Sequence, residues 1–126
     1  MAKLLRWRRQ PASGDYAAAG AYLSLLLRQA EARKVVARLR RAATTGQKPK
    51  DIERASGIQL LPQDDPEVQV EVKKSRKGKA LGPILLVRGA LGDGRPLVIA
   101  DGYHRICASY YVNQDAEIPC RIADLP

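Results

Sequence analysis

The chain has 126 residues and a net charge of +9, and 45% of its residues are hydrophobic. This composition is typical of a globular protein of one domain, and a chain of this length can bury a core without disulfides or a structural metal. No apolar run approaches the roughly 18 residues of a membrane span, and no secretory signal follows the basic start. We therefore expect a cytoplasmic, bacterial-type protein that makes no use of a membrane.

The cysteines and the single histidine offer little to a metal ion. Cys107 and Cys120 form no CxxC pair, and His104 is the only histidine of the chain. A zinc site made by this chain alone would lack ligands, so we expect no structural metal. Both cysteines are predicted to be buried free thiols, which is the common state of an unpaired cysteine.

The positive charge is concentrated in the first part of the chain. Residues 1–50 hold twelve Lys and Arg against two acids, a net charge of +10, whereas residues 51–126 hold ten against eleven, a net charge of −1. Such a segment is either a solvated helix face or a contact surface for nucleic acid. The candidate nucleic-acid contacts are Arg6, Arg8, Arg9, Arg33, Lys34, Arg38, Arg40 and Arg41.

Residues 1–14 are predicted to form a flexible basic tail, and residues 15–47 a helical segment with Asp15 as a candidate N-cap. One long basic helix over 16–43 would measure about 40 Å. Its apolar seam would consist of Tyr22, Leu25, Ala32, Val36, Leu39 and Ala43. Because this length exceeds the reach of a small core, part of the helix could project or form a homodimer with a second copy.

Residues 48–126 are predicted to form a small α+β domain. The elements expected in chain order are a short helix ending at Gly57, a short extended piece at "IQLLP", a helix over 66–77, a strand over 82–89, a hairpin at Asp93-Gly94, a strand over 96–101, a helix at "YHRICASYYVN" and a strand over 117–122.

The helix over 66–77 is predicted against a competing signal. Val68, Val70 and Val72 alternate with polar residues, which is typical of a strand. However, Asp65 suits an N-cap and is followed by proline, and a cluster of basic residues precedes Gly78, as at the end of a helix. These terminal signals decide for the helix.

The stretch "DGYHR", residues 101–105, is the candidate binding site. It lies where a predicted strand gives way to a helix, and a helix N-terminus attracts anions. Gly102 would allow close approach of a ligand to the backbone, and Tyr103 could lie over the ligand. His104 and Arg105 could donate hydrogen bonds to phosphate or carboxylate. Asp101 could cap the helix, hold the arginine or help to coordinate Mg²⁺. The same residues would also fit an ordinary strand-to-helix turn.

Residues 58–122 resemble the ParB/sulfiredoxin-like fold. The shared features are a helix opened by Asp-Pro, the strand "PILLV", a hairpin, a strand running into Gly-x-His-Arg, a helix, and a last strand near "IPCRI". The resemblance implies that the turn from Asp101 to Arg105 binds the phosphates of a nucleotide such as ATP or CTP, with Mg²⁺.

The chain departs from each relative that the resemblance suggests. Sulfiredoxins have a catalytic cysteine where this chain has Tyr103, and the residues up to Pro126 lack the helix-turn-helix of partition proteins. Free-serine kinases of this fold share the turn and need an upstream carboxylate, for which Glu53, Asp64 and Asp65 are candidates.

Three functions therefore remain open. One is a nucleotide- or phosphate-binding domain with weak NTPase or kinase-type phosphoryl transfer. Another is DNA or RNA binding, or regulation, through the basic helix. The third is a non-catalytic module that dimerises.

Overall fold

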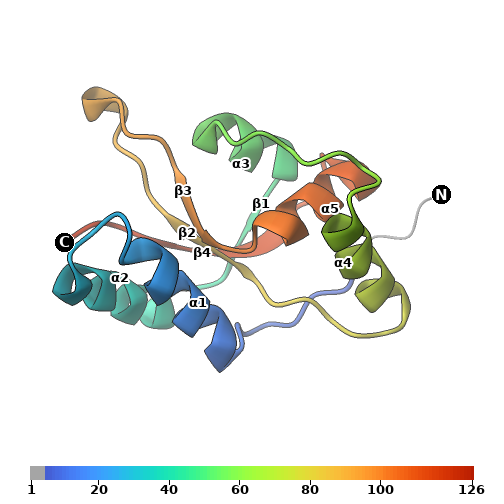
Figure 1. The fold of residues 1–126 in the computed structure, drawn as a ribbon, viewed down its shortest axis with the longest axis horizontal. Helices are drawn as coiled ribbons and strands as arrows, with labels where there is room; N and C mark the ends of the chain where they lie inside the picture. Colours follow the sequence, from blue (N-terminus) through green and yellow to red (C-terminus); the bar gives the residue numbers. More distant parts are fainter. Residues whose placement is uncertain (1–4) are drawn as a thin grey trace.

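The computed structural model describes residues 5–126 and centres on a four-stranded mixed sheet (Figure 1). The strands are β1 (Thr45–Gln47), β2 (Ile84–Val87), β3 (Val98–Asp101) and β4 (Ile118–Ala123). Their order in the sheet is β1-β4-β2-β3. The two central strands, β4 and β2, run parallel, and each edge strand is antiparallel to its neighbour. The predicted α+β class is confirmed.

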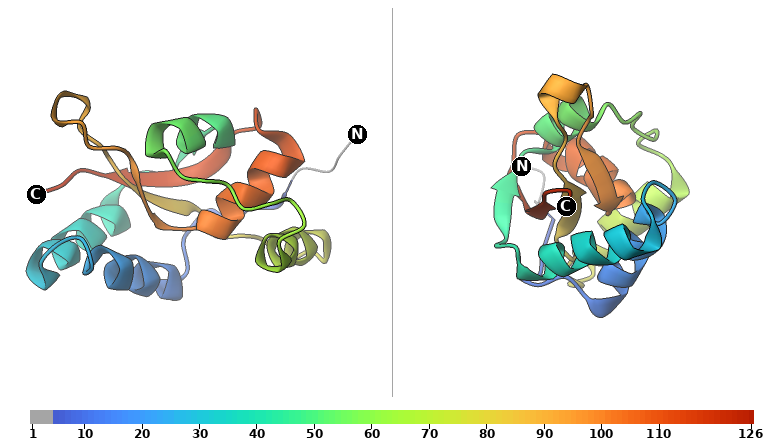
Figure 2. Two further views of the ribbon diagram at one scale, coloured as in Figure 1. Left: turned by 45° about the horizontal axis from the view of Figure 1, so that its top comes forward. Right: turned by 90° about the vertical axis from the view of Figure 1, so that its left-hand side faces the viewer.

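Helices cover both faces of the sheet (Figure 2). They are α1 (Ser13–Leu23), α2 (Gln29–Arg41), α3 (Pro49–Ser56), α4 (Pro66–Arg76) and α5 (Tyr103–Asn113). Successive side chains of β2 point to opposite faces of the sheet, and so they pack against different layers of helices. Leu85 and Val87 pack with α1 and α2, whereas Ile84 and Leu86 pack with α3 and α5. All four residues of β2 are buried, as an apolar run in a central strand requires.

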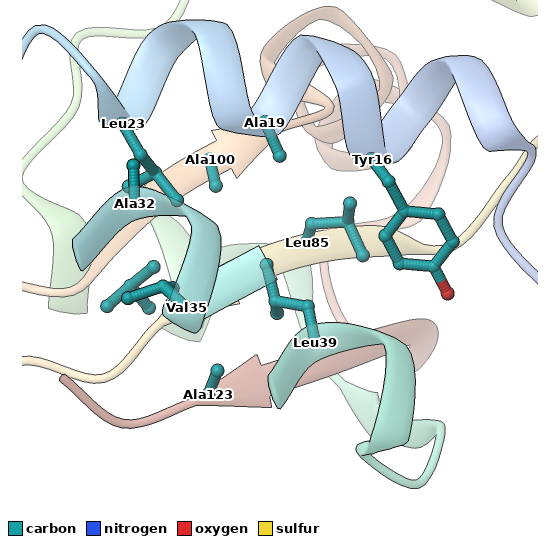
Figure 3. Packing of buried hydrophobic residues seen from close by; sticks show 10 residues of the cluster. Tyr16, Ala19, Leu23, Ala32, Val35, Leu39, Leu85, Ala100 and Ala123 are labelled. Atoms are coloured by element: carbon teal, nitrogen blue, oxygen red, sulfur yellow. The ribbon is translucent and has the colours of Figure 1, made fainter. Parts of the chain in front are cut away.

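The single long helix expected over 16–43 is wrong: the chain forms two helices, α1 and α2, that pack against each other. Helix α1 buries Tyr16, Ala19 and Leu23. Helix α2 repeats the same spacing with Ala32, Val35 and Leu39, and both stripes meet the sheet (Figure 3). A straight helix could place only one of these stripes on so small a sheet. A break between two shorter helices allows both apolar stripes to be buried against the sheet. The free energy gained by this burial outweighs the helix propensity of the residues between them.

The predicted seam is divided by this break. Leu25 is 81% exposed and Tyr22 is 45% exposed, whereas Ala32 and Leu39 belong to the core of the chain itself. Residues that already pack against the sheet are not available to a second copy. The long seam expected to support a homodimer therefore does not exist as a continuous surface.

Residues 5–10, which fall within the predicted flexible tail, lie along the segment before β2. Leu81 donates its backbone N–H to the carbonyl of Arg6, and Arg8 donates its own to the carbonyl of Leu81. Trp7 forms an isolated parallel bridge with Leu81. The part of the predicted tail before residue 5 lies outside the described residues.

Helix α4 confirms the prediction made from its terminal residues. The Asp65 carboxylate accepts hydrogen bonds from the first-turn N–H groups of Glu67 and Val68, and Gly78 takes a positive φ of 86° just beyond the end. Val68 and Val72 are buried while Val70 is exposed, so the valines follow a helical spacing and not a strand alternation.

The remaining expected elements form with small shifts in their ends. The predicted strands over 82–89, 96–101 and 117–122 appear as β2, β3 and β4, and α3 ends at Gly57 with φ of 68°. The extended piece at "IQLLP" forms no strand, and the short edge strand β1 lies at the end of the segment over 15–47 that was predicted to be helical.

Candidate functional site

A cavity of about 900 Å³ opens between α1, the segment before β2, β3 and the start of α5. It contains the whole of the predicted site. The five predicted residues that line it are Asp101, Gly102, Tyr103, His104 and Arg105. The other walls come from parts of the chain that sequence analysis did not connect with the turn: α1, the loop around Gly82, and α4 through Glu71 and Lys74.

The turn that begins α5 depends on Gly102. This residue has φ of 112° and is the N-cap of the helix. A Cβ atom at this position would lie 2.6 Å from Cδ1 of Ile84, so a larger residue meets both backbone strain and a clash. Glycine also supplies no side chain to cap the helix, and no other side chain does so. The first-turn N–H groups of α5 are therefore left for solvent or for a ligand in the cavity.

Arg105 has partners inside the protein. Its Nη1 donates to the carbonyl oxygens of Gly82 and Pro83, and its Nη2 donates to Oδ2 of Asp101 at 2.5 Å. The side chain is only 11% exposed. The sequence suggested a guanidinium fork directed at phosphate, but in the structure these donors are directed at the segment before β2 and at the end of β3. Arg105 thus positions the walls of the cavity.

Asp15 reaches the same cluster from α1. Its Oδ2 accepts a hydrogen bond from the N–H of Ala12 and lies 3.8 Å from Nη2 of Arg8 and 3.9 Å from Nη1 of Arg105. The residue is in the first turn of α1 and Ala12 is the N-cap, so the expected N-cap assignment of Asp15 is wrong. A Cβ at Gly82 would lie 2.5 Å from this carboxylate, so residue 82 must be glycine for Asp15 to approach Arg105.

Asp101 lies beside two charged partners of opposite effect. Burial raises the pKa of its carboxyl above the ordinary value, and the nearby Asp15 raises it further, while the guanidinium of Arg105 opposes both. Asp15 and Asp101 are thus a pair of carboxylates held around one buried arginine. The upstream carboxylate candidates of the sequence, Glu53, Asp64 and Asp65, do not line this cavity.

Sequence reasoning missed Asp15 as a site residue because nothing near it matches a motif. Only the packing of α1 against β3 brings it beside Asp101. The one available signal was its place in the first turn of an apolar helix, and that signal indicates helix capping and not a site.

His104 and Tyr103 are fixed by residues before and within α4. Nε2 of His104 lies 2.6 Å from Oε2 of Glu67, and its side chain is 39% exposed. The Tyr103 hydroxyl donates to the carbonyl of Gln59, which ties the start of α5 to the loop before α4. Two further cationic side chains, those of Arg8 and Lys74, line the cavity and are about half exposed.

The candidate nucleic-acid residues do not form one surface. Arg8 belongs to the cavity, and Arg38 donates to the carbonyls of Asp124 and Leu125. Arg40 lies over the ring of Tyr16, 4.3 Å from its centroid. All eight residues of this set are nevertheless exposed.

Both cysteines are buried and free, as predicted. Within residues 5–126, no group of three or more His, Cys, Asp and Glu residues is placed to hold a metal ion. None of the helices in the described part of the chain is long and apolar enough to cross a membrane.

No protein-family model, curated protein or solved structure matches the chain.

Proposed function

We propose that the cavity binds a small phosphorylated ligand, a nucleotide in the first instance, with its phosphates at the start of α5. The observation that carries this proposal is the uncapped N-terminus of α5, which opens into a cavity of about 900 Å³. Unpaired N–H groups and the helix dipole favour an anion at this position. The resemblance of "DGYHR" to the phosphate-binding turn of the ParB/sulfiredoxin-like fold supports the same ligand.

The charges of the cavity suit a phosphate that arrives with a cation. Three carboxylates line it, those of Asp15, Glu71 and Asp101, against three permanent cations, those of Arg8, Lys74 and Arg105. Side-chain charge alone therefore gives no strong attraction for an anion. Nucleotides carry Mg²⁺, which binds through one or two carboxylates together with the phosphates and keeps several of its waters. Asp101 and Asp15 would hold such an ion, which would neutralise phosphate charge when bound.

The roles of the other residues follow from their positions. Lys74 and His104 would contact the phosphate oxygens, because both side chains line the cavity and keep access to solvent. Arg105 would hold the turn in place from beneath. Apolar residues of the cavity wall would face the less polar part of the ligand; they include Tyr22, Leu26, Ile58, Leu97 and Ile99.

Calorimetric titration with ATP, CTP, GTP and their diphosphates, with and without Mg²⁺, tests the proposal. We expect one nucleotide to bind, and the Lys74→Ala/His104→Ala variant to bind at least tenfold more weakly, because each hydrogen bond to a charged group contributes about 1.5–3 kcal/mol. Lys73→Ala is the matched control, since Lys73 is exposed on the same helix and does not line the cavity. Failure of the folded protein to bind any of these nucleotides, or equal binding by the double variant, would contradict the site.

A further inference from the structure

Helix α2 presents a basic face on the side opposite to its buried stripe. Ala32, Val35 and Leu39 point into the core. With a rotation of 100° per residue, the opposite side of the helix centres on Ala37. The cations on this side are Arg33, Lys34, Arg40 and Arg41, and all four are exposed. We call these four residues the α2 basic face.

No residue of the α2 basic face forms an ion pair within the described chain. Other surface cations are divided: Lys50 lies 2.5 Å from Asp115 and Arg88 lies 2.8 Å from Asp124, whereas the exposed basic residues at the end of α4, apart from Lys74, form no ion pair within the described chain either. The only acid of α2 is Glu31, which lies in its first turn and is partly buried. Four like charges on a helix about 20 Å long therefore repel one another with no internal compensation.

A shallow groove of about 420 Å³ runs between α1 and this face. Its α1 wall consists of the small residues Ala17, Gly20 and Ala21 together with Tyr16 at the edge, and its α2 wall includes Arg33 and Arg40. Small side chains on one wall and guanidinium groups on the other would let a sugar–phosphate strand approach the helices closely. No α2 residue lines the cavity at the start of α5, so this surface is separate from the proposed nucleotide site.

We propose that the α2 basic face binds the phosphate backbone of duplex DNA without reading its sequence. An uncompensated row of cations matches a polyanion, and binding releases the counterions condensed on the DNA. Single-stranded nucleic acid is disfavoured, because it is usually held by bases stacked on exposed aromatic side chains. Helix α2 has no aromatic residue, and Tyr16, at the edge of the groove, is buried and covered by Arg40.

The test measures the salt dependence of binding of the full chain to a labelled DNA duplex of mixed sequence, by fluorescence anisotropy between about 50 and 200 mM salt. Four phosphate contacts predict a slope of log K against log salt of about −3.6, from about −0.9 per contact. The Arg33→Gln/Lys34→Gln variant should reduce the magnitude of the slope by about 2 and weaken binding. The matched control is Lys73→Gln/Arg76→Gln on α4, which removes the same charges from exposed positions and should leave the slope unchanged.

Several outcomes would overturn the proposal. Absence of binding at about 50 mM salt would exclude duplex DNA as the partner of this face. An equal loss in the α2 and α4 variants would show diffuse attraction to net charge and no defined surface. Tighter binding of a single strand of the same length, or of phosphatidylserine vesicles, would assign the face to a different partner. Each variant should retain the wild-type circular dichroism spectrum, because the substituted residues are exposed and glutamine favours helix.

Discussion

Replacing Arg105 by methionine should destabilise the fold far more than the loss of a surface charge. The substitution keeps most of the aliphatic volume but removes the donors to Gly82, Pro83 and Asp101. Removing one partner of a buried ion pair costs about 3–5 kcal/mol. Asp101 faces the cavity with 18% of its side chain exposed, so water can partly replace the arginine. We therefore expect a loss of about 2–4 kcal/mol in the free energy of unfolding, or about 8–15 °C in Tm for a chain of this size.

Urea denaturation followed by circular dichroism measures this loss. Arg54→Met is the control, because Arg54 forms an exposed pair with Asp51 and its removal should cost less than about 0.5 kcal/mol. A double-mutant cycle with Asp101→Asn should give a coupling energy of about 1–3 kcal/mol, since the two side chains are in direct contact. A cost below about 1 kcal/mol for Arg105→Met, or additive effects in the cycle, would refute the view that this arginine organises the cavity.

Three further measurements test the turn and the buried groups. Gly102→Ala should cost about 2–4 kcal/mol because of its positive φ and the contact with Ile84, whereas Gly92→Ala, with no atom within 4 Å of its Cβ, should be nearly neutral in the same denaturation assay. The thiols of Cys107 and Cys120 should not react with a disulfide reagent at pH 8 until the protein unfolds. Burial raises the pKa of both thiols, that of Cys120 to about 12, and so keeps them protonated. Rapid reaction of the folded protein would contradict this prediction. Burial raises the pKa of the Asp101 carboxyl above its ordinary value of 3.8, so this group stabilises the fold below pH 3.8 and loses that contribution as pH rises through its folded pKa. The stability of Asp101→Asn relative to wild type should therefore increase from pH 4 to pH 7. A constant difference between the two proteins would refute this prediction.

Elements with strong local signals could be predicted from the sequence, and those decided by distant packing could not. Asp65 and Gly78 mark the two ends of α4 by their own chemistry, so the helix was found despite the alternating valines. The break between α1 and α2 has no proline or glycine, since residues 24–28 read "SLLLR". The break forms because two short helices can bury both apolar stripes on the sheet, whereas one long helix can bury only one. Strand β1 has three residues and pairs only with β4, a partner that no local pattern reveals.

In the candidate site, likewise, the sequence predicts where the residues lie but not what each side chain contacts. The sequence placed Asp101 to Arg105 at a strand-to-helix turn, because an apolar strand, a glycine and a helical run are local features. The role of each side chain depends on what lies opposite, and Arg105 is directed by Gly82 and Pro83, residues of another segment. Once the guanidinium is occupied there, any phosphate at this turn must be held chiefly by the backbone of α5 and by Lys74 and His104. Binding would then tolerate loss of one side chain better than a change at Gly102, which sets the direction of the N–H groups themselves.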